Sequence, residues 1–385
     1  MKIKGVCSEY VLTGMPAILM PELIKPTPES PASLIIEQRG ETVYTGRLYS
    51  SSGVDISEVL STVAFRPDVY AFDQEPLATV VPMSELEAYA VTCLVEQDGK
   101  KETISVIPFS GGVPSLEAVS AARLGGDVFS KRFLANGRNR FFTTRTAGRI
   151  VEMTEYEAGP LYFLVKEPNS TIEVTDVNTG YSLLYERMDN GVLGICFDKM
   201  RREFFDYFET IANAFEISIQ GVKSATVVIT HTCPAEWSAR LVFRNSYGFF
   251  ETVGITGDVG FNVDTDDIEV YTEYAPERGS GMEVSLLSSV SASASALLDP
   301  VSPLRLPSFV DMLMSDEVYL EANGCRVRVL VTSEDVPLKD RPTVPAVFTL
   351  KMQMSLEERY ATPYANTLSG DGDGLFASMF GNEFD

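Results

Sequence analysis

The chain has 385 residues with 54 acidic and 31 basic side chains, so its formal net charge is −23. A chain this acidic has no overall electrostatic attraction to nucleic acids or to anionic membranes, and we expect neither as a partner. Hydrophobic residues make up 45% of it, which is ordinary for a globular protein and excludes disorder over the whole length. A single histidine excludes histidine-rich metal sites and leaves little side-chain chemistry for proton transfer near neutral pH.

Cysteine spacing and the N-terminal sequence indicate a reducing compartment. The five cysteines lie far apart and form no CxxC pair, so we expect free thiols rather than disulfides or a zinc site. The apolar stretch behind Lys2 and Lys4 is interrupted by Glu9, Pro16 and Pro21, which argues against a signal peptide. No run approaches the roughly 18 apolar residues of a membrane span. We therefore expect a protein that is made in the cytoplasm and is not secreted.

Short runs rich in β-branched and aromatic residues, separated by Gly, Asn, Asp and Pro, dominate the chain. This pattern predicts a mainly β protein of two or three antiparallel β-sandwich-like domains with few short helices. Shifts in composition predict an N-terminal domain, a middle domain, a C-terminal domain and an acidic aromatic tail, at residues 1–125, 126–222, 223–365 and 366–385.

The N-terminal domain is expected to contain two β-hairpins. Residues 33–48 predict the first, with its turn near residues 38–41 and with Gly40 free to take a positive φ. Residues 90–108 predict the second, in which Asp98 and Gly99 have the sequence of a type I′ turn. Short helices are expected at 55–63, behind a capping aspartate, and at 114–124.

The middle domain is expected to be built from strands about ten residues apart, the spacing of an antiparallel sandwich or barrel. These strands are predicted at 139–144, 149–153, 161–165, 171–175 and 181–186. Residues 199–215 carry five aromatic side chains that match neither the helix period nor the strand period, so both alternatives stay open there.

The C-terminal domain is expected to contain a turn at Asn245 and Gly248, between strands at 241–243 and 249–253. The small-residue stretch 285–298 favours a strand or an ordered loop, with a linker as the alternative. A short helix is expected at 307–315, with a proline in its first turn.

No residue pattern singles out a catalytic site. His231 and Cys233 would share a strand face, but Cα atoms two residues apart on a strand are roughly 6.5–7 Å apart, which is long for a nucleophile pair. Phosphate-binding loops, nucleophile elbows and HExxH are absent from the sequence. Asp264 and Asp266 match the first two positions of a calcium loop that then breaks off; this cluster and the acidic pair at 371–373 favour solvated turns. We expect no enzyme activity, no cofactor and no metal.

Charged and aromatic residues instead indicate protein interfaces. Arginines alternate with aromatic residues in the basic stretch 132–149, whereas residues 251–299 carry ten acids and one base. In so acidic a chain, contact of the basic stretch with acidic surfaces of other subunits is favoured over binding of single-stranded nucleic acid. The aromatic residues of the tail favour docking on a partner, and a frayed terminus is the alternative. The interface candidates are Arg138, Arg140, Arg145, Trp237, Tyr247, Phe250, Phe376, Phe380 and Phe384, with core packing as the alternative for Trp237 and Phe250.

Three segments occur in a recognisable order. They are RNRFFTTR at 138–145 before a strand ending at 161–164, WSARLVFRNSYGFFE at 237–251, and LPSFVDMLMSDEVYL at 306–320 before a strand at 326–332. Together they resemble poorly characterised virion- or tail-associated proteins of phages and prophages of Bacteroidetes. The resemblance extends loosely over residues 30–360 and does not include the tail. Its motifs are structural, so it transfers no catalytic residue.

The resemblance implies a structural component of a phage-like particle, in the tail or at the tail tip. Such a protein would act by assembly with other virion proteins and with copies of itself, as a homo-oligomer, and without membrane or nucleic-acid partners. It would be synthesised in the host bacterial cytoplasm and localised in the virion. The alternatives are a carbohydrate-binding or carbohydrate-cleaving β-sandwich module and a secreted adhesin, which the interrupted N-terminal apolar stretch disfavours.

Overall fold

The computed structural model describes residues 1–4, 6, 8–67, 75–112, 129–134, 140–145, 149–231, 239–255, 259–275, 280–297, 305–322, 325–333 and 349–354, and for 259–275 and 280–297 it describes the backbone only. The chain divides into two compact units, Met1–Thr230 with Arg244–Glu251, and His231–Phe243 with Thr252–Asp385. Strands make up 50% of the structure and helices 16%, so the prediction of a mainly β protein with multiple sandwich-like domains is confirmed. The finer division of the chain at residues 125 and 222 stays a prediction.

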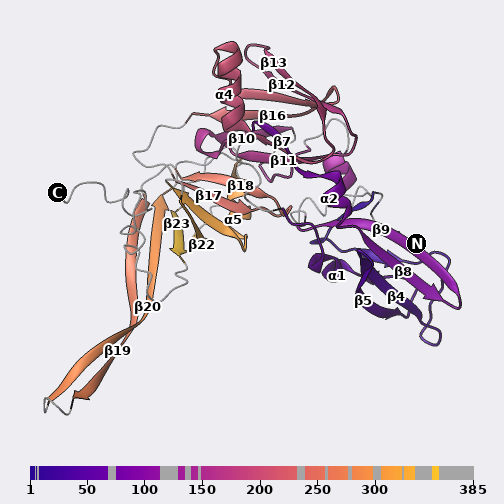
Figure 1. Cartoon of the computed structure of the whole chain (residues 1–385), viewed down its shortest axis with the longest axis horizontal. Coiled ribbons are helices and arrows are strands. Elements are labelled where there is room, and N and C mark those ends of the chain that lie inside the picture. Colours follow the sequence, from indigo (N-terminus) through magenta and orange to yellow (C-terminus); the bar gives the residue numbers. More distant parts are fainter. Residues whose placement is uncertain are drawn as a thin grey trace, which may run out of the picture. The chain divides into compact units, whose positions relative to one another are not determined.

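Two sheets form the N-terminal part of the first unit (Figure 1). The larger has the order β2-β9-β8-β4-β5 and consists of β2 (Tyr10–Leu12), β9 (Lys100–Phe109), β8 (Val91–Gln97), β4 (Ala32–Gln38) and β5 (Glu41–Leu48). The smaller contains β1 (Lys2–Ile3), β3 (Ile18–Met20) and β6 (Val54–Asp55), followed by α1 (Ser57–Thr62). Every second side chain of β4 and of β8 is buried, as expected for strands with one face on a core. That core also takes Ile3, Leu19 and Leu60 from the smaller sheet and α1, which makes this part sandwich-like.

Both predicted hairpins are confirmed in this part. The first turn has Arg39 at φ 53° and Gly40 at φ 80°, and the second has Asp98 at φ 51° and Gly99 at φ 79°. Two successive positive φ angles define the type I′ turn, whose twist matches that of the strands it joins. The predicted helix at 55–63 is observed as α1, although its N-cap residue is Ile56 rather than an aspartate.

Two further sheets and one helix form the middle part of the first unit. The first sheet has the order β10-β16-β15-β12-β13, and the second has the order β11-β14-β7. Their strands are β7 (Leu77–Pro82), β10 (Ile150–Thr154), β11 (Pro160–Val165), β12 (Ser170–Asp176), β13 (Ser182–Met188), β14 (Gly191–Cys196), β15 (Ala214–Ile219) and β16 (Val222–Thr230). The short elements α2 (Met83–Glu87), η1 (Ser130–Leu134) and η2 (Glu155–Glu157) lie in the same unit, and α4 (Phe197–Phe208) follows β14 directly.

The β11-β14-β7 sheet lies between two cores. Leu161 and Phe163 on one face of β11 pack in a core with β10, β12, β15, β16 and α4, whereas Tyr162 and Leu164 on the other face pack in a second core with Tyr10 and other residues of the N-terminal part. Both faces of β11 are therefore buried, which accounts for its uninterrupted apolar sequence. The second core contains nine aromatic residues, namely Tyr10, Phe65, Phe109, Phe129, Phe133, Phe142, Tyr162, Tyr247 and Phe249.

Three features of the structure differ from the predicted elements or go beyond them. Residues 140–145 form no strand, because side chains satisfy part of their backbone hydrogen bonding. Residues 199–215 include most of α4 and the start of β15, so their aromatic residues belong to two different elements and fit neither period. Pairing is antiparallel in most of the sheets, but β10 pairs with β16 and β2 with β9 in parallel.

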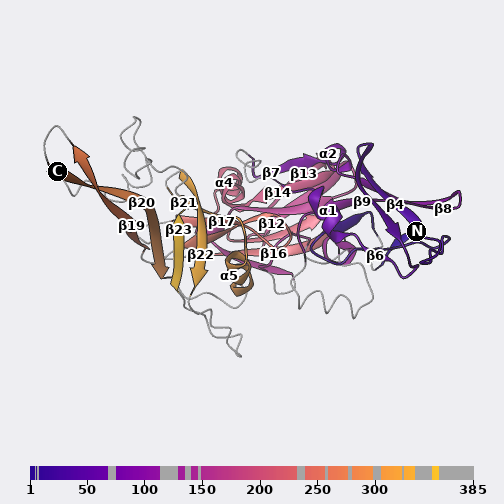
Figure 2. The same ribbon diagram turned by 90° about the horizontal axis from the view of Figure 1, so that it is seen from below.

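A seven-stranded sheet forms most of the second unit and has the order β18-β17-β21-β22-β23-β20-β19 (Figure 2). Its strands are β17 (Ala239–Arg244), β18 (Phe250–Ile255), β19 (Val259–Ala275), β20 (Ser280–Leu297), β21 (Val318–Ala322), β22 (Cys325–Ser333) and β23 (Thr349–Met354), and α5 (Leu306–Leu313) precedes β21. Of the two structures predicted for residues 285–298, the strand is correct up to Leu297, because these residues belong to β20. The solvated turn predicted at residues 264–267 is wrong, since they lie inside β19 and pair with β20.

Candidate functional site: a buried arginine and its two carboxylates

The site is built on residues 140–145, an irregular segment between η1 and β10. Phe141 packs in the core below the β11-β14-β7 sheet, and Phe142 packs in the aromatic core on its other side. The backbone N–H of Phe142 donates to the carbonyl oxygen of Tyr162 at 2.8 Å, which fixes the segment against β11. Two neighbouring rings anchored in separate cores thus fix the segment just before Arg145, which is itself buried.

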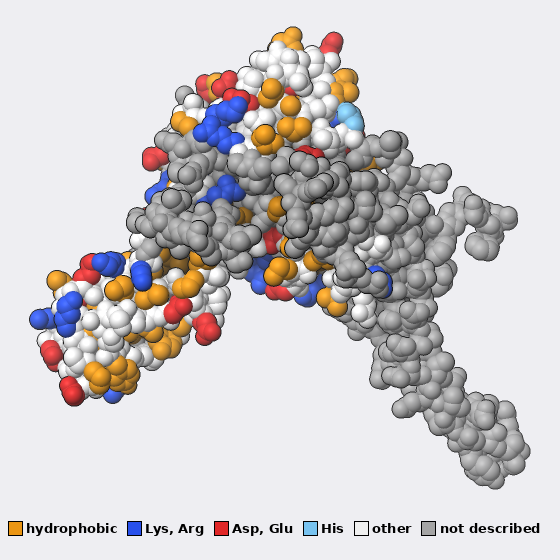
Figure 3. Space-filling view, turned by 180° about the vertical axis from the view of Figure 1, so that it is seen from behind, with side chains coloured by type: hydrophobic (Ala, Val, Ile, Leu, Met, Phe, Trp, Pro, Cys, Tyr) orange, Lys and Arg blue, Asp and Glu red, His pale blue; other side chains and the backbone are white. Residues whose placement is uncertain are grey.

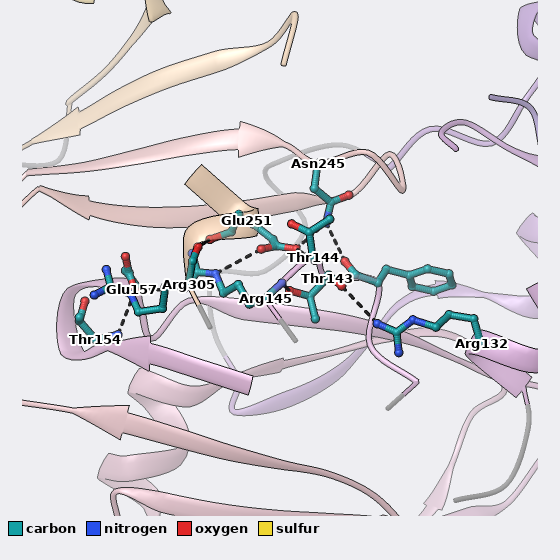
Figure 4. A network of polar contacts seen from close by, with 11 residues as sticks. Arg132, Thr143, Thr144, Arg145, Thr154, Glu157, Asn245, Glu251 and Arg305 are labelled. Carbon is teal, nitrogen blue, oxygen red and sulfur yellow. Dashed lines mark hydrogen bonds and ion pairs between the residues drawn. The ribbon is translucent and has the colours of Figure 1, made fainter. Parts of the chain in front are cut away.

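Arg145 is 1% exposed and joins two carboxylates of its own chain (Figure 4). Its Nη1 donates to Oε2 of Glu157 at 3.1 Å, and its Nε donates to Oε2 of Glu251 at 3.2 Å. Glu157 and Glu251 are 1% and 2% exposed. Ion pairs that are removed from water to this degree act at short range in a low dielectric, so they are strong but depend on complete hydrogen bonding.

Local hydrogen bonds orient both carboxylates toward the arginine. Oε2 of Glu157 also accepts the backbone N–H of Thr154 at 2.9 Å, as part of the capping box that starts η2. Oε1 of Glu251 accepts the backbone N–H of Thr144 at 3.2 Å and the side-chain Nδ2 of Asn245 at 2.6 Å. The arginine thus connects η2 to the start of β18 through residues far apart in the sequence.

Asn245 organises the turn that carries Tyr247. Its Oδ1 accepts the backbone N–H groups of Tyr247 and Phe249, both at 3.0 Å, and its Nδ2 also donates to the carbonyl oxygen of Phe142 at 2.7 Å. The backbone N–H of Gly248 closes the turn by donating to the carbonyl oxygen of Asn245 at 2.9 Å. Gly248, where φ is 85°, also packs closely on Ser110, because a Cβ there would lie 1.8 Å from the Ser110 carbonyl oxygen. The predicted turn at Asn245 and Gly248 is therefore confirmed, and the asparagine supplies its internal hydrogen bonds.

The chemistry of this arrangement is that of a structural anchor. Arginine stays protonated in proteins and cannot act as a base. Both carboxylates are almost fully buried and accept N–H groups of their own chain. The network therefore holds segments of the first unit together.

The predicted interface residues fall into two groups in the structure. Arg138, Trp237, Phe376, Phe380 and Phe384 lie outside the described residues. The other four are described: Arg140 is half-buried, and Arg145, Tyr247 and Phe250 are buried. Burial lowers the pKa of the Arg140 guanidinium.

The structure corrects the expectation for Arg145 and assigns two aromatic candidates to the interior. Arg145 was expected to meet acidic surfaces of another subunit, but its acidic partners belong to its own chain. Tyr247 packs edge-to-face on Phe133, with ring centroids 5.1 Å apart. The guanidinium of Arg244 covers the ring of Phe250 at 4.3 Å, which agrees with the core alternative for Phe250.

Glu157, Glu251 and Asn245 were missed as site residues. Thr154 and Glu157 carry the spacing of a capping box, which was a detectable signal for Glu157. Asn245 was recognised as a turn residue only, and Glu251 follows two phenylalanines with no local pattern of its own. Nothing in the linear sequence pairs either residue with Arg145.

The structure describes only some of the other candidate residues. Within the part of the chain that it describes, no three His, Cys, Asp or Glu side chains gather as a metal site would require. Cys233 and the acidic pair at 371–373 lie outside the described residues, as do the side chains of Asp264 and Asp266. The helices among the described residues include none of the length and apolarity needed to cross a membrane.

Comparison with known proteins gives no relative. No family model and no curated protein matches the chain. Weakly similar solved structures include a 1.5-MDa bacterial ice-binding adhesin, with 10% identity, 77% of this chain and 91% of that chain covered, and a TM-score of 0.14. SGBP-B of the Bacteroides ovatus mixed-linkage glucan utilization locus has 9% identity, coverages of 73% and 64%, and a TM-score of 0.15. Extracellular domains 3–5 of Drosophila OTK have 10% identity, coverages of 76% and 91%, and a TM-score of 0.14. Scores this low carry no argument about function.

Proposed function

We propose that the protein is a structural component of a phage-like particle, in the tail or at its tip, that assembles with other virion proteins. The sequence resemblance to virion- and tail-associated proteins motivates the proposal. The observation that supports it best is a long two-stranded ribbon in the second unit, formed by the distal parts of β19 and β20 (Figure 1).

The ribbon extends beyond its own sheet. β19 and β20 keep one continuous register from Val259 opposite Ala296 to Ala275 opposite Ser280. The neighbouring strand β23 pairs with β20 only over Ala292–Leu297. From Asp264 to Ser291 the two strands therefore pair only with each other among the described strands. At about 3.3 Å per residue, this ribbon is about 40 Å long.

A ribbon of this kind is suited to binding another protein. An isolated two-stranded hairpin is marginally stable in water and gains stability when a third strand or another surface covers it. Strands β19 and β20 together carry six acidic residues and no basic residue, so a basic surface is the complementary partner. Charge of one sign along the ribbon would also direct its approach to such a surface.

Shortening the ribbon tests the proposal. Residues 267–288 are replaced by Asn-Gly, a two-residue hairpin turn that joins Asp266 to its cross-strand partner Ser289. A matched control keeps the full ribbon and replaces only residues 276–279 by Asn-Gly. Both variants are co-expressed with the neighbouring particle genes, and the fraction of each in gradient-purified particles is measured by immunoblotting.

We expect the shortened protein to fold, so that its far-UV circular dichroism spectrum differs from that of the wild type only by the signal of the removed strand residues. We also expect it to be lost from particles. The control variant should be incorporated like the wild type. Equal incorporation of both variants would remove the ribbon from the assembly contact. Absence of the wild-type protein from all particles would contradict the virion role itself.

A further inference from the structure

Beyond assembly, the first unit carries an exposed aromatic ledge where α4 lies beside β13, the edge strand of its sheet. The ledge consists of Tyr181, Tyr185, Glu203, Tyr207 and Phe208. We propose that it binds a neutral saccharide, with the rings of Tyr181 and Tyr207 stacking on pyranose rings and Glu203 accepting hydroxyl hydrogen bonds.

The ring of Tyr181 is held in place from beneath, and both it and the ring of Tyr207 remain open to solvent. Tyr181 stacks on Phe208 with a centroid distance of 4.7 Å and an interplanar angle of 6°, so one of its faces is covered and rigid. Tyr181 is nevertheless 47% exposed, and Tyr207, whose centroid is 6.4 Å from that of Phe208, is 69% exposed. Phe208 itself packs on Phe204 in the core, at 5.6 Å. A pre-positioned ring such as that of Tyr181 loses little entropy when a ligand binds.

A polar group lies beside the rings. The hydroxyl of Tyr185 donates a hydrogen bond to Oε2 of Glu203. The pKa of Tyr185 is raised mainly by burial and further by the hydrogen bond to this carboxylate. Glu203 and Tyr207 are four residues apart on α4, so they lie on one side of the helix. An aromatic face next to a fixed carboxylate matches the two surfaces of a sugar, which are its apolar C–H face and its rim of hydroxyl groups.

Size and charge favour a saccharide over a protein. An aromatic side chain buries about 150–250 Å² when fully covered, so the exposed parts of these rings offer about 300 Å². A stable protein interface needs about 800 Å² on each side. Glu203, Asp206 and Glu209 make this end of α4 acidic, which disfavours acidic sugars. In the space-filling view, exposed hydrophobic side chains are interspersed with charged ones over the visible described surface rather than forming one broad patch (Figure 3).

The full-length protein is titrated by calorimetry with neutral hexasaccharides of glucose, mannose and xylose, and with a sialylated oligosaccharide as the acidic comparison. We expect at least one neutral hexasaccharide to bind with a Kd below about 1 mM and the acidic one not to bind. Tyr181→Ala and Tyr207→Ser should each weaken binding about tenfold. Tyr181→Phe keeps the ring and should retain binding.

Two control variants separate the ledge from exposed rings in general. Phe205 is 53% exposed on the opposite flank of α4, since residues two apart on a helix differ by about 200°, and Tyr49 is 54% exposed in the N-terminal part. Phe205→Ala and Tyr49→Ala should bind like the wild type. The proposal is overturned if no neutral hexasaccharide binds, if only the acidic one binds, or if Tyr207→Ser, a change at a mostly exposed position, leaves affinity unchanged. Concentration-dependent dimerisation that Tyr207→Ser abolishes would show a protein-docking surface and would equally overturn it.

Discussion

Replacing Arg145 by methionine tests whether the buried network anchors the first unit. The substitution removes the guanidinium that pairs with both Glu157 and Glu251, and these two carboxylates are buried, at 1% and 2% exposure. Breaking a buried ion pair on one side costs about 3–5 kcal/mol, because the remaining charge stays desolvated. For a domain of this size, that corresponds to a fall in melting temperature of roughly 10 °C.

The assay is urea denaturation of the wild type and the variant, followed by far-UV circular dichroism and extrapolated linearly to water. Arg202→Met is the matched control, because Arg202 pairs with Asp198 at 2.8 Å on the surface, with side chains 73% and 49% exposed. An exposed pair of this type contributes about 0.3–0.5 kcal/mol, so the control should be nearly neutral.

A compensated variant separates charge from packing. Adding Glu157→Gln and Glu251→Gln to Arg145→Met removes both negative charges but keeps oxygen acceptors for Thr154, Thr144 and Asn245. We expect it to recover at least about 1 kcal/mol of the loss. The reasoning is refuted if Arg145→Met stays within 1 kcal/mol of the wild type, or if the compensated variant is less stable than Arg145→Met alone.

Three further predictions follow from the first unit. Phe249→Ala should cost about 3–5 kcal/mol in the same assay, because its ring stacks on Phe142 at 4.2 Å and 9° in the aromatic core; a loss below 1 kcal/mol would contradict this. Gly248→Ala should cost at least about 2 kcal/mol, because its Cβ would meet the carbonyl oxygen of Ser110 at 1.8 Å. The control Gly99→Ala, where φ is 79° and no atom lies near the added Cβ, should cost about 1 kcal/mol. Equal losses of stability in the two variants would rule out the clash. Burial raises the pKa of Glu102, but hydrogen bonds from the α-amino group of Met1 and from the N–H groups of Glu22, Ile24 and Leu23 outweigh it and lower the pKa to about 2. Its stabilisation should therefore be complete above pH 4.5 and disappear as the pH falls to about 2, and Glu102→Gln should flatten acid unfolding over that range.

The sequence predicted best those elements whose pattern is set by local chemistry. The hairpin turns at Gly40 and Gly99 need positive φ angles, and the dipeptide Asp98-Gly99 is a sequence typical of turns with such angles. The alternation along β8 directly reflects one face on a core. The continuous apolar run of β11 was recognisable as a strand, but only the structure shows that its two faces belong to different cores.

The site was less predictable because its partners are distant in sequence. Arg145 and Glu251 are 106 positions apart in the sequence, and the hydrogen bond of Asn245 to the Phe142 carbonyl oxygen helps to bring them together. The sequence pattern of a basic, aromatic segment is the same whether its arginines face solvent or a buried carboxylate. Residues 140–145 were misassigned as a strand for a related reason: their apolar and β-branched composition is that of a strand, while side chains replace part of the ladder hydrogen bonds.

The internal pairing of Arg145 changes which assembly partner the charges favour. The basic stretch 132–149 was expected to meet acidic surface on another copy, but one of its arginines is neutralised within the chain and Arg140 is half-buried. The chain as a whole carries a charge of −23, and the ribbon strands carry six acids without a base. Two copies therefore repel each other along the ribbon, and the internal pairing of Arg145 leaves the basic stretch with less positive charge to offset this. Under the proposed assembly role, a ribbon contact is consequently favoured with a different, basic protein, and self-association of this chain would have to use apolar contacts elsewhere.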